Sequence, residues 1–244
     1  MNPSVHQLTL ALGRKRRIRL DDFIPGDNHP ALTALESTLN GKGELLLYFW
    51  GRPATGKSHL LLGACDRLAS QRRRPAYLAL ADPRRHPPAA REQFDHLDLI
   101  CIDNLEGIVG HTAWEQTLFD LFNRLRASRK PLLFAASAPP NELPIRLPDL
   151  KSRLTWGAVF HLTPPDDLSR QQALIAGASR IGMTLTPQAA NYLLRHYSRD
   201  LSQLFDFLDR LDTVTLETKS QPTIPLLKQL IAAHPAETER VDHT

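Results

Sequence analysis

The stretch "GRPATGKSHLL", residues 51–61, decides which fold we expect for this chain. Its first eight residues, Gly51 to Ser58, match the pattern GxxxxGK[ST], in which glycines let backbone N–H groups converge on phosphate oxygens. The stretch lies between an apolar run at 45–49, which predicts a strand, and a helical pattern at 58–70. This context predicts a P-loop, with the positive end of the helix dipole directed at the phosphates.

We expect the whole loop to take part in nucleotide binding. Lys57 would neutralise the terminal phosphates, and the Ser58 hydroxyl would ligate the Mg²⁺ that accompanies them. Asp103 ends a second apolar run, "LICID", and is the expected acidic partner of that Mg²⁺. The expected loop contacts are Gly51, Arg52, Pro53, Ala54, Thr55, Gly56, Lys57, Ser58 and His59.

The residue after Asp103 argues against rapid hydrolysis by the chain itself. Hydrolysing P-loop proteins usually carry a carboxylate there, which orients the attacking water, but this chain has Asn104, whose amide cannot accept a proton. Glu106 is an alternative carboxylate, although we expect a solvated loop residue at that position. The sequence therefore predicts a nucleotide-binding protein with weak or no ATPase activity of its own.

Apolar runs and helical patterns alternate up to residue 162, which is typical of a parallel sheet covered by helices. The expected strands are 45–49, 76–80, 97–103, 131–137 and 158–162. The helical patterns that follow contain no strand and cover 168–181, 187–196, 200–213 and 222–233. We therefore expect an α/β fold, with a five-stranded parallel sheet core at 21–163 and a small helical lid domain at 164–234. An N-terminal arm (1–20) and a tail (235–244) flank them.

Composition sets further limits. The 244 residues carry a formal net charge of +4 with a pI of about 9.3, which permits an anionic partner. The two cysteines form no CxxC pair and the ten histidines show no metal-binding spacing, so neither a disulfide framework nor a zinc site is indicated. No apolar run approaches the roughly 20 residues that span a bilayer, and no secretion signal is recognisable. We expect a cytoplasmic protein with no membrane partner.

Together these motifs resemble those of the AAA+ ATPases, and within them the family of the bacterial initiator DnaA. The resemblance extends over about residues 19–234, and it rests on the order and spacing of four further stretches. These are "RLDDFIPGDNHPAL" (19–32), "AASAPPNELP" (135–144), "DLKSRLTWG" (149–157) and "YSRDLSQLFDFLDRLD" (197–212). The resemblance implies an adenine pocket and two residues near the phosphates. The residues concerned are Phe23, Ile24 and Asn28 for adenine, and Ser137 and Arg199 for the phosphates.

The stretch at 149–157 resembles a motif whose arginine, here Arg153, points into the nucleotide site of an adjacent protomer. Such a guanidinium stabilises charge that develops in the transition state, and an arginine finger supplied in trans contributes about 10³ to 10⁵ in rate. We expect Trp156 to anchor the loop of Arg153. The alternative is that Arg153 is an ordinary surface or salt-bridge arginine.

The hexad "QLTLAL" at 7–12 resembles the peptide by which many proteins bind the bacterial sliding clamp, the β subunit of DNA polymerase III. An extended segment would place alternating leucines in apolar pockets, while a glutamine amide anchors it by hydrogen bonds. The expected clamp contacts are Gln7, Leu8, Leu10 and Leu12. An edge strand of this protein is the alternative.

The resemblance implies a negative regulator of replication initiation. Such a protein would hold ADP (or ATP) with Mg²⁺, dock on the DNA-loaded clamp and stimulate hydrolysis of DnaA-bound ATP. DNA would be contacted mainly through the clamp, and a homodimer or homo-oligomer is left open. The chain ends at Thr244, so we expect no further DNA-reading domain.

Two rival functions remain at this point. One is a stand-alone AAA+ ATPase loader. The other is a nucleotide-gated DNA-binding adaptor whose basic residues, at 14–17, at 72–74 and at Arg84 and Arg85, would contact the phosphate backbone.

Overall fold

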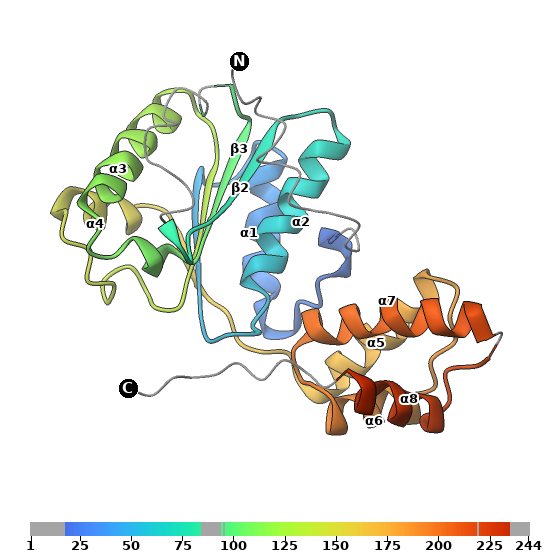
Figure 1. Cartoon of the computed structure of the whole chain (residues 1–244). Coiled ribbons are helices and arrows are strands. Elements are labelled where there is room, and N and C mark those ends of the chain that lie inside the picture. The colour runs from blue at the N-terminus through green and yellow to red at the C-terminus, as the bar shows by residue number, and fades with distance from the viewer. Residues whose placement is uncertain (1–17, 84–93, 95, 219, 235–244) are drawn as a thin grey trace, which may run out of the picture. The chain divides into compact units, whose positions relative to one another are not determined.

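The computed structural model describes residues 18–83, 94, 96–218 and 220–234 (Figure 1). Two compact units divide between Pro164 and Pro165, and each is described by itself. The first is a parallel sheet with helices on both faces, and the described residues of the second form helices and no strand. The expected α/β class with a C-terminal helical lid domain is therefore confirmed.

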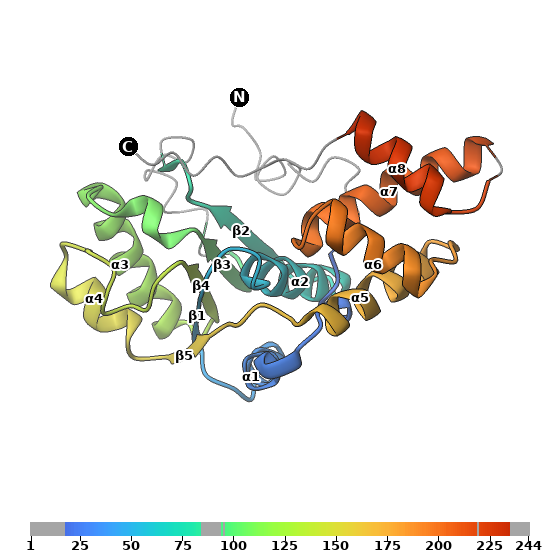
Figure 2. The same ribbon diagram turned by 90° about the horizontal axis from the view of Figure 1, so that it is seen from below.

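The sheet of the first unit has five parallel strands in the order β2-β3-β4-β1-β5, which Figure 2 shows side by side. They are β1 (Leu46–Trp50), β2 (Pro75–Ala79), β3 (Leu99–Asp103), β4 (Leu132–Ala136) and β5 (Ala158–His161). Each falls on an apolar run that the sequence identified. Because the strands are parallel, their carboxyl ends share one edge of the sheet, and their amino ends share the other. We call these the carboxyl edge and the amino edge.

Among the described residues, four α-helices cover the two faces of this sheet (Figures 1 and 2). Helices α1 (His29–Leu39) and α2 (Lys57–Ser70) lie on one face, and α3 (Thr112–Ala127) and α4 (Pro148–Leu154) lie on the other. Side chains along a strand alternate between the faces. In β1, Leu47 and Phe49 pack in the core under α1 and α2, whereas Leu46 and Tyr48 pack in the core under α3 and α4. Both faces of the sheet are thus buried, as its continuous apolar strands require.

Helices α1 and α4 were not expected from periodicity. The buried residues Ala31, Leu35 and Leu39 of α1 recur every four positions, a signal that was present in the sequence but overlooked. Helix α4 has only seven residues and begins with Pro148 at its first position. So short a helix gives too few turns for a hydrophobic period to stand out.

The described residues of the second unit form four helices. They are α5 (Asp167–Arg180), α6 (Pro187–His196), α7 (Leu201–Thr218) and α8 (Ile224–Ala233). The side chain of Asp166 begins α5 by accepting a hydrogen bond from the backbone N–H of Ser169 at 2.7 Å. Hydrogen bonding with the Ser169 side chain, followed by this backbone bond, lowers the pKa of Asp166. Helix α7 continues past its expected end at residue 213. The β-branched residues there cost less than about 0.7 kcal/mol each in a helix, and no glycine or proline interrupts them.

No helix in the described part of the chain is long and apolar enough to cross a membrane.

Candidate nucleotide site

The P-loop connects β1 to α2 at the carboxyl edge, and two of its glycines are sterically required. A Cβ added at Gly51 would lie 2.4 Å from the carbonyl oxygen of Leu162. Gly56 has a φ of 92°, and a Cβ there would lie 2.6 Å from the ring of Phe23. Helix α2 begins at the next residue, so its first backbone N–H groups, which have no partners within the helix, open onto this loop.

Lys57 folds back over the loop and supplies its cation. Its Nζ donates hydrogen bonds to the carbonyl oxygens of Gly51, at 2.7 Å, and of Arg52, at 2.8 Å. Burial lowers the pKa of Lys57, and the carboxylates of Asp103 and Glu106 partly oppose that shift. The ammonium group is therefore partly desolvated and close to two carboxylates, a position from which it can neutralise phosphate charge.

Asp103, Tyr77 and Ser58 bring oxygen atoms together beside the loop. Asp103 is buried at the end of β3, where Oδ2 accepts a hydrogen bond from the Tyr77 hydroxyl at 2.6 Å. Burial, followed by the charge of Asp103, raises the pKa of Tyr77, and a hydrogen bond with the Ser58 side chain partly offsets this rise. The hard oxygen donors of Ser58 and Asp103 therefore fit Mg²⁺, which prefers oxygen ligands and would neutralise phosphate charge when bound with a nucleotide.

Tyr77 was not anticipated as a site residue, and it gives a testable prediction. Its hydroxyl donates to a buried carboxylate, and a hydrogen bond to a charged group contributes about 1.5–3 kcal/mol. Tyr77→Phe should therefore lower the free energy of unfolding of the nucleotide-free protein by that amount in urea titrations. Tyr192→Phe is the matched control, because no hydrogen bond of the Tyr192 hydroxyl is found in the described part of the chain. Equal stability of the two variants would show that Asp103 does not depend on Tyr77.

Glu106, which we expected to be a solvated loop carboxylate, is partly buried and makes a hydrogen bond. Its Oε2 accepts a hydrogen bond from the backbone N–H of Ser137 at 3.2 Å, so it links the segments after β3 and β4. Its charge also acts on Lys57. Asn104, by contrast, adopts a left-handed conformation with φ 55°, which asparagine tolerates better than most residues. We therefore predict that Glu106, and not Asn104, orients any water that attacks at this edge.

Any hydrolysis by the isolated chain should depend on Glu106. A residue that orients or deprotonates the attacking water contributes about 10² to 10⁴ in rate. We expect Glu106→Gln to slow single-turnover hydrolysis of radiolabelled ATP at least about 100-fold, with ATP affinity unchanged. Glu142→Gln, at an exposed residue after β4, is the control. Unchanged turnover in Glu106→Gln would exclude this role.

The residues expected to contact adenine lie around the start of the described chain. The Phe23 ring packs against Gly56 and lies 5.7 Å from the His59 ring, centroid to centroid. Ile24 is half-buried. Asn28 is buried, and its amide exchanges two 2.8 Å hydrogen bonds with the backbone of Thr163. The amide of Asn28 thus joins two parts of the first unit, and its contact with a nucleotide stays a prediction.

Three other expectations concern residues of the second unit or residues outside the described part of the chain. Arg199 belongs to the second unit, where it forms an ion pair with Asp167, so its approach to the phosphates stays a prediction. The clamp-binding candidates Gln7, Leu8, Leu10 and Leu12 lie outside the described residues. So do the basic run at 14–17 and both Arg84 and Arg85.

Arg153 lies at the amino edge, far from the P-loop of its own chain. The guanidinium carbon is 3.8 Å from the ring centroid of Trp156 and 5.7 Å from that of Phe122. Gly157, which follows Trp156, packs so closely on Leu46, the first residue of β1, that a Cβ would lie 2.2 Å from the Leu46 carbonyl oxygen. A five-residue strand, about 16 Å long, therefore separates Arg153 from the P-loop.

The surroundings of Arg153 bear on the alternatives left by the sequence. Within the described residues, no carboxylate forms an ion pair with Arg153. Its partner is instead the indole of Trp156, which is 50% exposed. Arg153 is therefore a cation held on an aromatic surface at the edge of the sheet, and not a salt-bridge arginine of the described chain.

The strand order, the P-loop after β1, the buried acid at the end of β3 and the helical second unit define an AAA+ P-loop protein. Comparison with known families agrees. The model of the bacterial DnaA ATPase domain matches residues 15–161, and the model of the Hda lid domain matches residues 167–231. The chain belongs to the Hda and DnaA-like AAA+ family.

Solved structures share this fold at low sequence identity. Domain III of the replication initiation protein DnaA from Thermotoga maritima is 22% identical, with a TM-score of 0.71 over 89% of this chain and 95% of that one. AMPPCP-bound DnaA from Aquifex aeolicus is 20% identical, with a TM-score of 0.66 over 82% and 66%. A variant of RuvB from Thermotoga maritima is 16% identical, with a TM-score of 0.63 over 89% and 72%.

Proposed function

We propose that this protein binds an adenine nucleotide in its P-loop and regulates replication initiation by acting on the nucleotide of DnaA. Family membership supports the replication role, and the DnaA structures bound to AMPPCP support nucleotide binding. In this proposal ADP with Mg²⁺ is the resident ligand. Lys57 binds its phosphates, and Ser58 and Asp103 hold the metal.

The observation that carries the proposal is the separation of Arg153 from its own P-loop. The cation lies at the amino edge on an exposed indole, and Lys57 lies at the carboxyl edge. A guanidinium about one strand length away from its own phosphates cannot stabilise their transfer. We propose that its target is instead the nucleotide of a neighbouring subunit, and that this neighbour is DnaA.

The chemistry asked of Arg153 is electrostatic. Its planar guanidinium can donate two parallel hydrogen bonds to phosphoryl oxygens. Charge builds up on these oxygens in the transition state, so donors already in place lower the barrier. Asn104 leaves the protein's own site without the usual carboxylate at that position, which fits a nucleotide that is held for long periods. The protein would thus act as an activator of the ATPase of DnaA.

The direct test mixes the purified protein with ATP-bound DnaA, sliding clamp and DNA, and follows ATP hydrolysis. We expect hydrolysis to accelerate in the complete mixture and to return to the intrinsic rate of DnaA when this protein is omitted. An equal rate with and without this protein would refute the proposed function.

Docking on the clamp is assigned to the N-terminal hexad. Leu8→Ala removes an apolar anchor, so we expect recovery of the protein on immobilised clamp to fall at least about tenfold. Thr9→Ala is the matched control, because in the proposed extended segment alternation would direct residue 9 away from the face of Leu8 and Leu10. Equal recovery of both variants and the wild type would show that Leu8 of the hexad does not contribute to clamp binding.

A second candidate is a stand-alone ATPase, and Glu106 is the observation that favours it. Its carboxylate accepts a hydrogen bond from the backbone N–H of Ser137 at the carboxyl edge, and its charge acts on Lys57. Steady-state ATP turnover by the isolated protein, lost in Glu106→Gln, would favour this candidate over the role of activator. Retention on DNA without clamp, falling steeply with salt, would instead favour a DNA-binding adaptor.

A further inference from the structure

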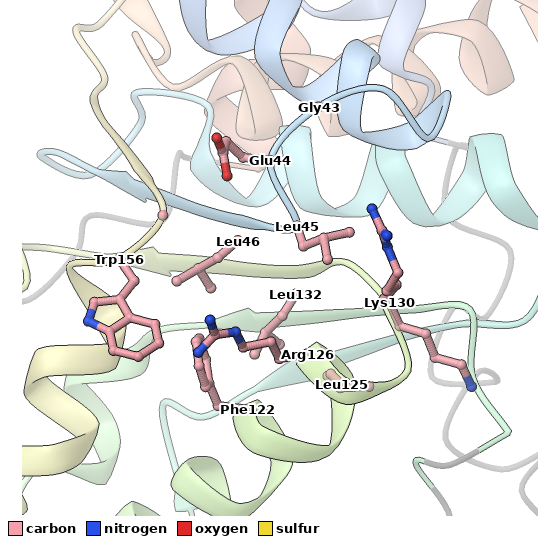
Figure 3. A pocket seen from close by; sticks show the side chains of 12 residues that line it. Gly43, Glu44, Leu45, Leu46, Phe122, Leu125, Arg126, Lys130, Leu132 and Trp156 are labelled. Atoms are coloured by element: carbon pink, nitrogen blue, oxygen red, sulfur yellow. The ribbon is translucent and has the colours of Figure 1, made fainter.

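A groove of about 370 Å³ lies at the amino edge of the sheet, beside Trp156 (Figure 3). It is formed by the segments that lead into β1, β4 and β5 and by the last turns of α3. The P-loop lies at the opposite edge, so the nucleotide site does not account for this groove. Its volume is at the lower end of the range for small-ligand sites, enough for one or two side chains of a partner.

The floor of the groove is apolar. Leu46, Leu125, Leu132 and Phe122 line it, and each is at most 6% exposed. A nucleobase placed there would bury its ring nitrogen and exocyclic polar atoms against hydrocarbon, without hydrogen-bond partners from these side chains. An aliphatic or aromatic side chain suits this floor better, because its burial removes only apolar surface from water.

The rim of the groove is cationic. The guanidinium carbon of Arg126 is 4.6 Å from the ring centroid of Trp156, and Figure 3 shows these two side chains next to each other. Arg153 lies against the same indole at 3.8 Å. Arg129 is exposed at the end of α3, and neither Arg126 nor Arg129 forms an ion pair within the described residues. Among the described residues that line the groove, Glu44 is the single acidic one.

Arg129 also has an unusual backbone conformation. It follows α3 with a φ of 52°. The N–H of Arg129 donates to the carbonyl oxygen of Arg126 at 3.1 Å, and the N–H of Lys130 donates to the carbonyl oxygen of Leu125 at 2.9 Å. Glycine is the usual residue at this position of a helix end, because a side chain is strained there. This backbone strain does not depend on the direction of the side chain. Replacing Arg129 by glycine should therefore remove the guanidinium without harming the fold.

We propose that this groove binds a protein segment in which a carboxylate lies next to an apolar side chain. The apolar side chain fills the floor formed by Leu125 and Leu132, and the carboxylate pairs with Arg126 and Arg129 at the rim. The charge of the rim and the apolar side chains of the floor together select this chemistry. A partner held there would lie beside Arg153, so the groove would orient whatever protein the finger acts on.

The test uses the full chain and short fluorescein-labelled peptides, with fluorescence anisotropy as the measurement. The probe is Glu-Glu-Leu-Asp-Asp-amide, with fluorescein attached to its N-terminal amine. One control peptide replaces the acids by their amides, and another replaces the central leucine by glycine. We expect each control to bind at least about tenfold more weakly, because it lacks either the charge or the apolar anchor. Labelled dT8 tests for a nucleic-acid site.

Variants locate the binding in the groove. Arg129→Gly should weaken binding of the acidic peptide at least about tenfold. The melting temperature of the variant protein should stay equal to that of the wild type or rise, because glycine relieves the left-handed strain. Arg195→Gly, at an exposed position in α6, should leave peptide binding unchanged. Failure of the acidic peptide to bind, undiminished binding in Arg129→Gly, or tighter binding of dT8 would each overturn the proposal.

These measurements use neither DnaA nor the clamp. A negative result would therefore remove the groove assignment and leave the role of Arg153 open, and loss of the Arg153 assignment would leave peptide binding intact.

Discussion

Arg153→Ala removes most of the stimulation of DnaA-bound ATP hydrolysis, with an expected loss of about 10³-fold or more. In the wild type, the guanidinium of Arg153 would face the charge that develops on the partner's phosphate. Its loss should therefore raise the energy of the transition state and leave docking unchanged. Single-turnover hydrolysis on ATP-bound DnaA, with clamp and DNA present, measures the loss. The protein concentration that gives half-maximal stimulation should change little, because the hexad and the groove are intact.

Two further variants separate chemistry from packing in this experiment. Arg153→Lys keeps the charge but lacks the planar pair of donors, so it should restore only a small part of the rate. Arg195→Ala removes an exposed arginine of α6 and should stimulate like the wild type. Loss of an arginine finger should lower stimulation about 10³-fold. If Arg153→Ala stimulates within about threefold of the wild type, Arg153 is not such a finger.

Lys57→Ala abolishes nucleotide retention. Removing one partner of a hydrogen-bonded charge pair costs about 2–5 kcal/mol, which is about 30-fold to several thousand-fold in affinity. Isothermal titration with ADP and Mg²⁺ measures this loss, and nucleotide that copurifies with the wild type should be absent. Lys42→Ala, which changes an exposed lysine before β1, is the control. Unaltered ADP affinity in Lys57→Ala would show that the loop does not bind phosphate through this residue.

The pKa of Lys57 adds a signature to the same variant. Burial lowers this pKa from the ordinary value of 10.5, so the unfolded chain binds more protons than the folded chain in the alkaline range just below that value. The free energy of unfolding of the nucleotide-free wild type therefore gains a positive slope with pH in this window. Lys57→Ala should lack that gain and should be no less stable near neutral pH. An identical pH dependence in both proteins would contradict the lowered pKa.

The strands and the P-loop could be predicted because their signals are local. Each strand is a short apolar run, and the residues from Gly51 to Ser58 are consecutive in the chain. Helix α4 could not be predicted in this way, since seven residues give no clear hydrophobic period. The end of α7 was expected at residue 213, but the helix continues to Thr218, because the β-branched residues that follow cost too little to end it.

The parts of the site that depend on strand order were beyond local reasoning. Tyr77 reaches Asp103 because β2 pairs with β3, and the register Ala79 to Asp103 sets their approach. Glu106 meets Ser137 because β3 neighbours β4, although the two residues are far apart in sequence. The groove likewise needs three segments that only the folded sheet brings together. Arg153 was singled out by family resemblance, and its distance from the P-loop follows from the parallel topology.

The most direct measurement of the central claim labels the two nucleotides separately. DnaA is loaded with γ-³²P-labelled ATP and this protein with unlabelled ADP, and release of labelled phosphate is followed on the clamp–DNA complex. We expect rapid release with the wild-type protein and release at the intrinsic rate of DnaA with Arg153→Ala. Rapid release that persists without the guanidinium of Arg153 would contradict the claim that this residue acts on the nucleotide of its neighbour.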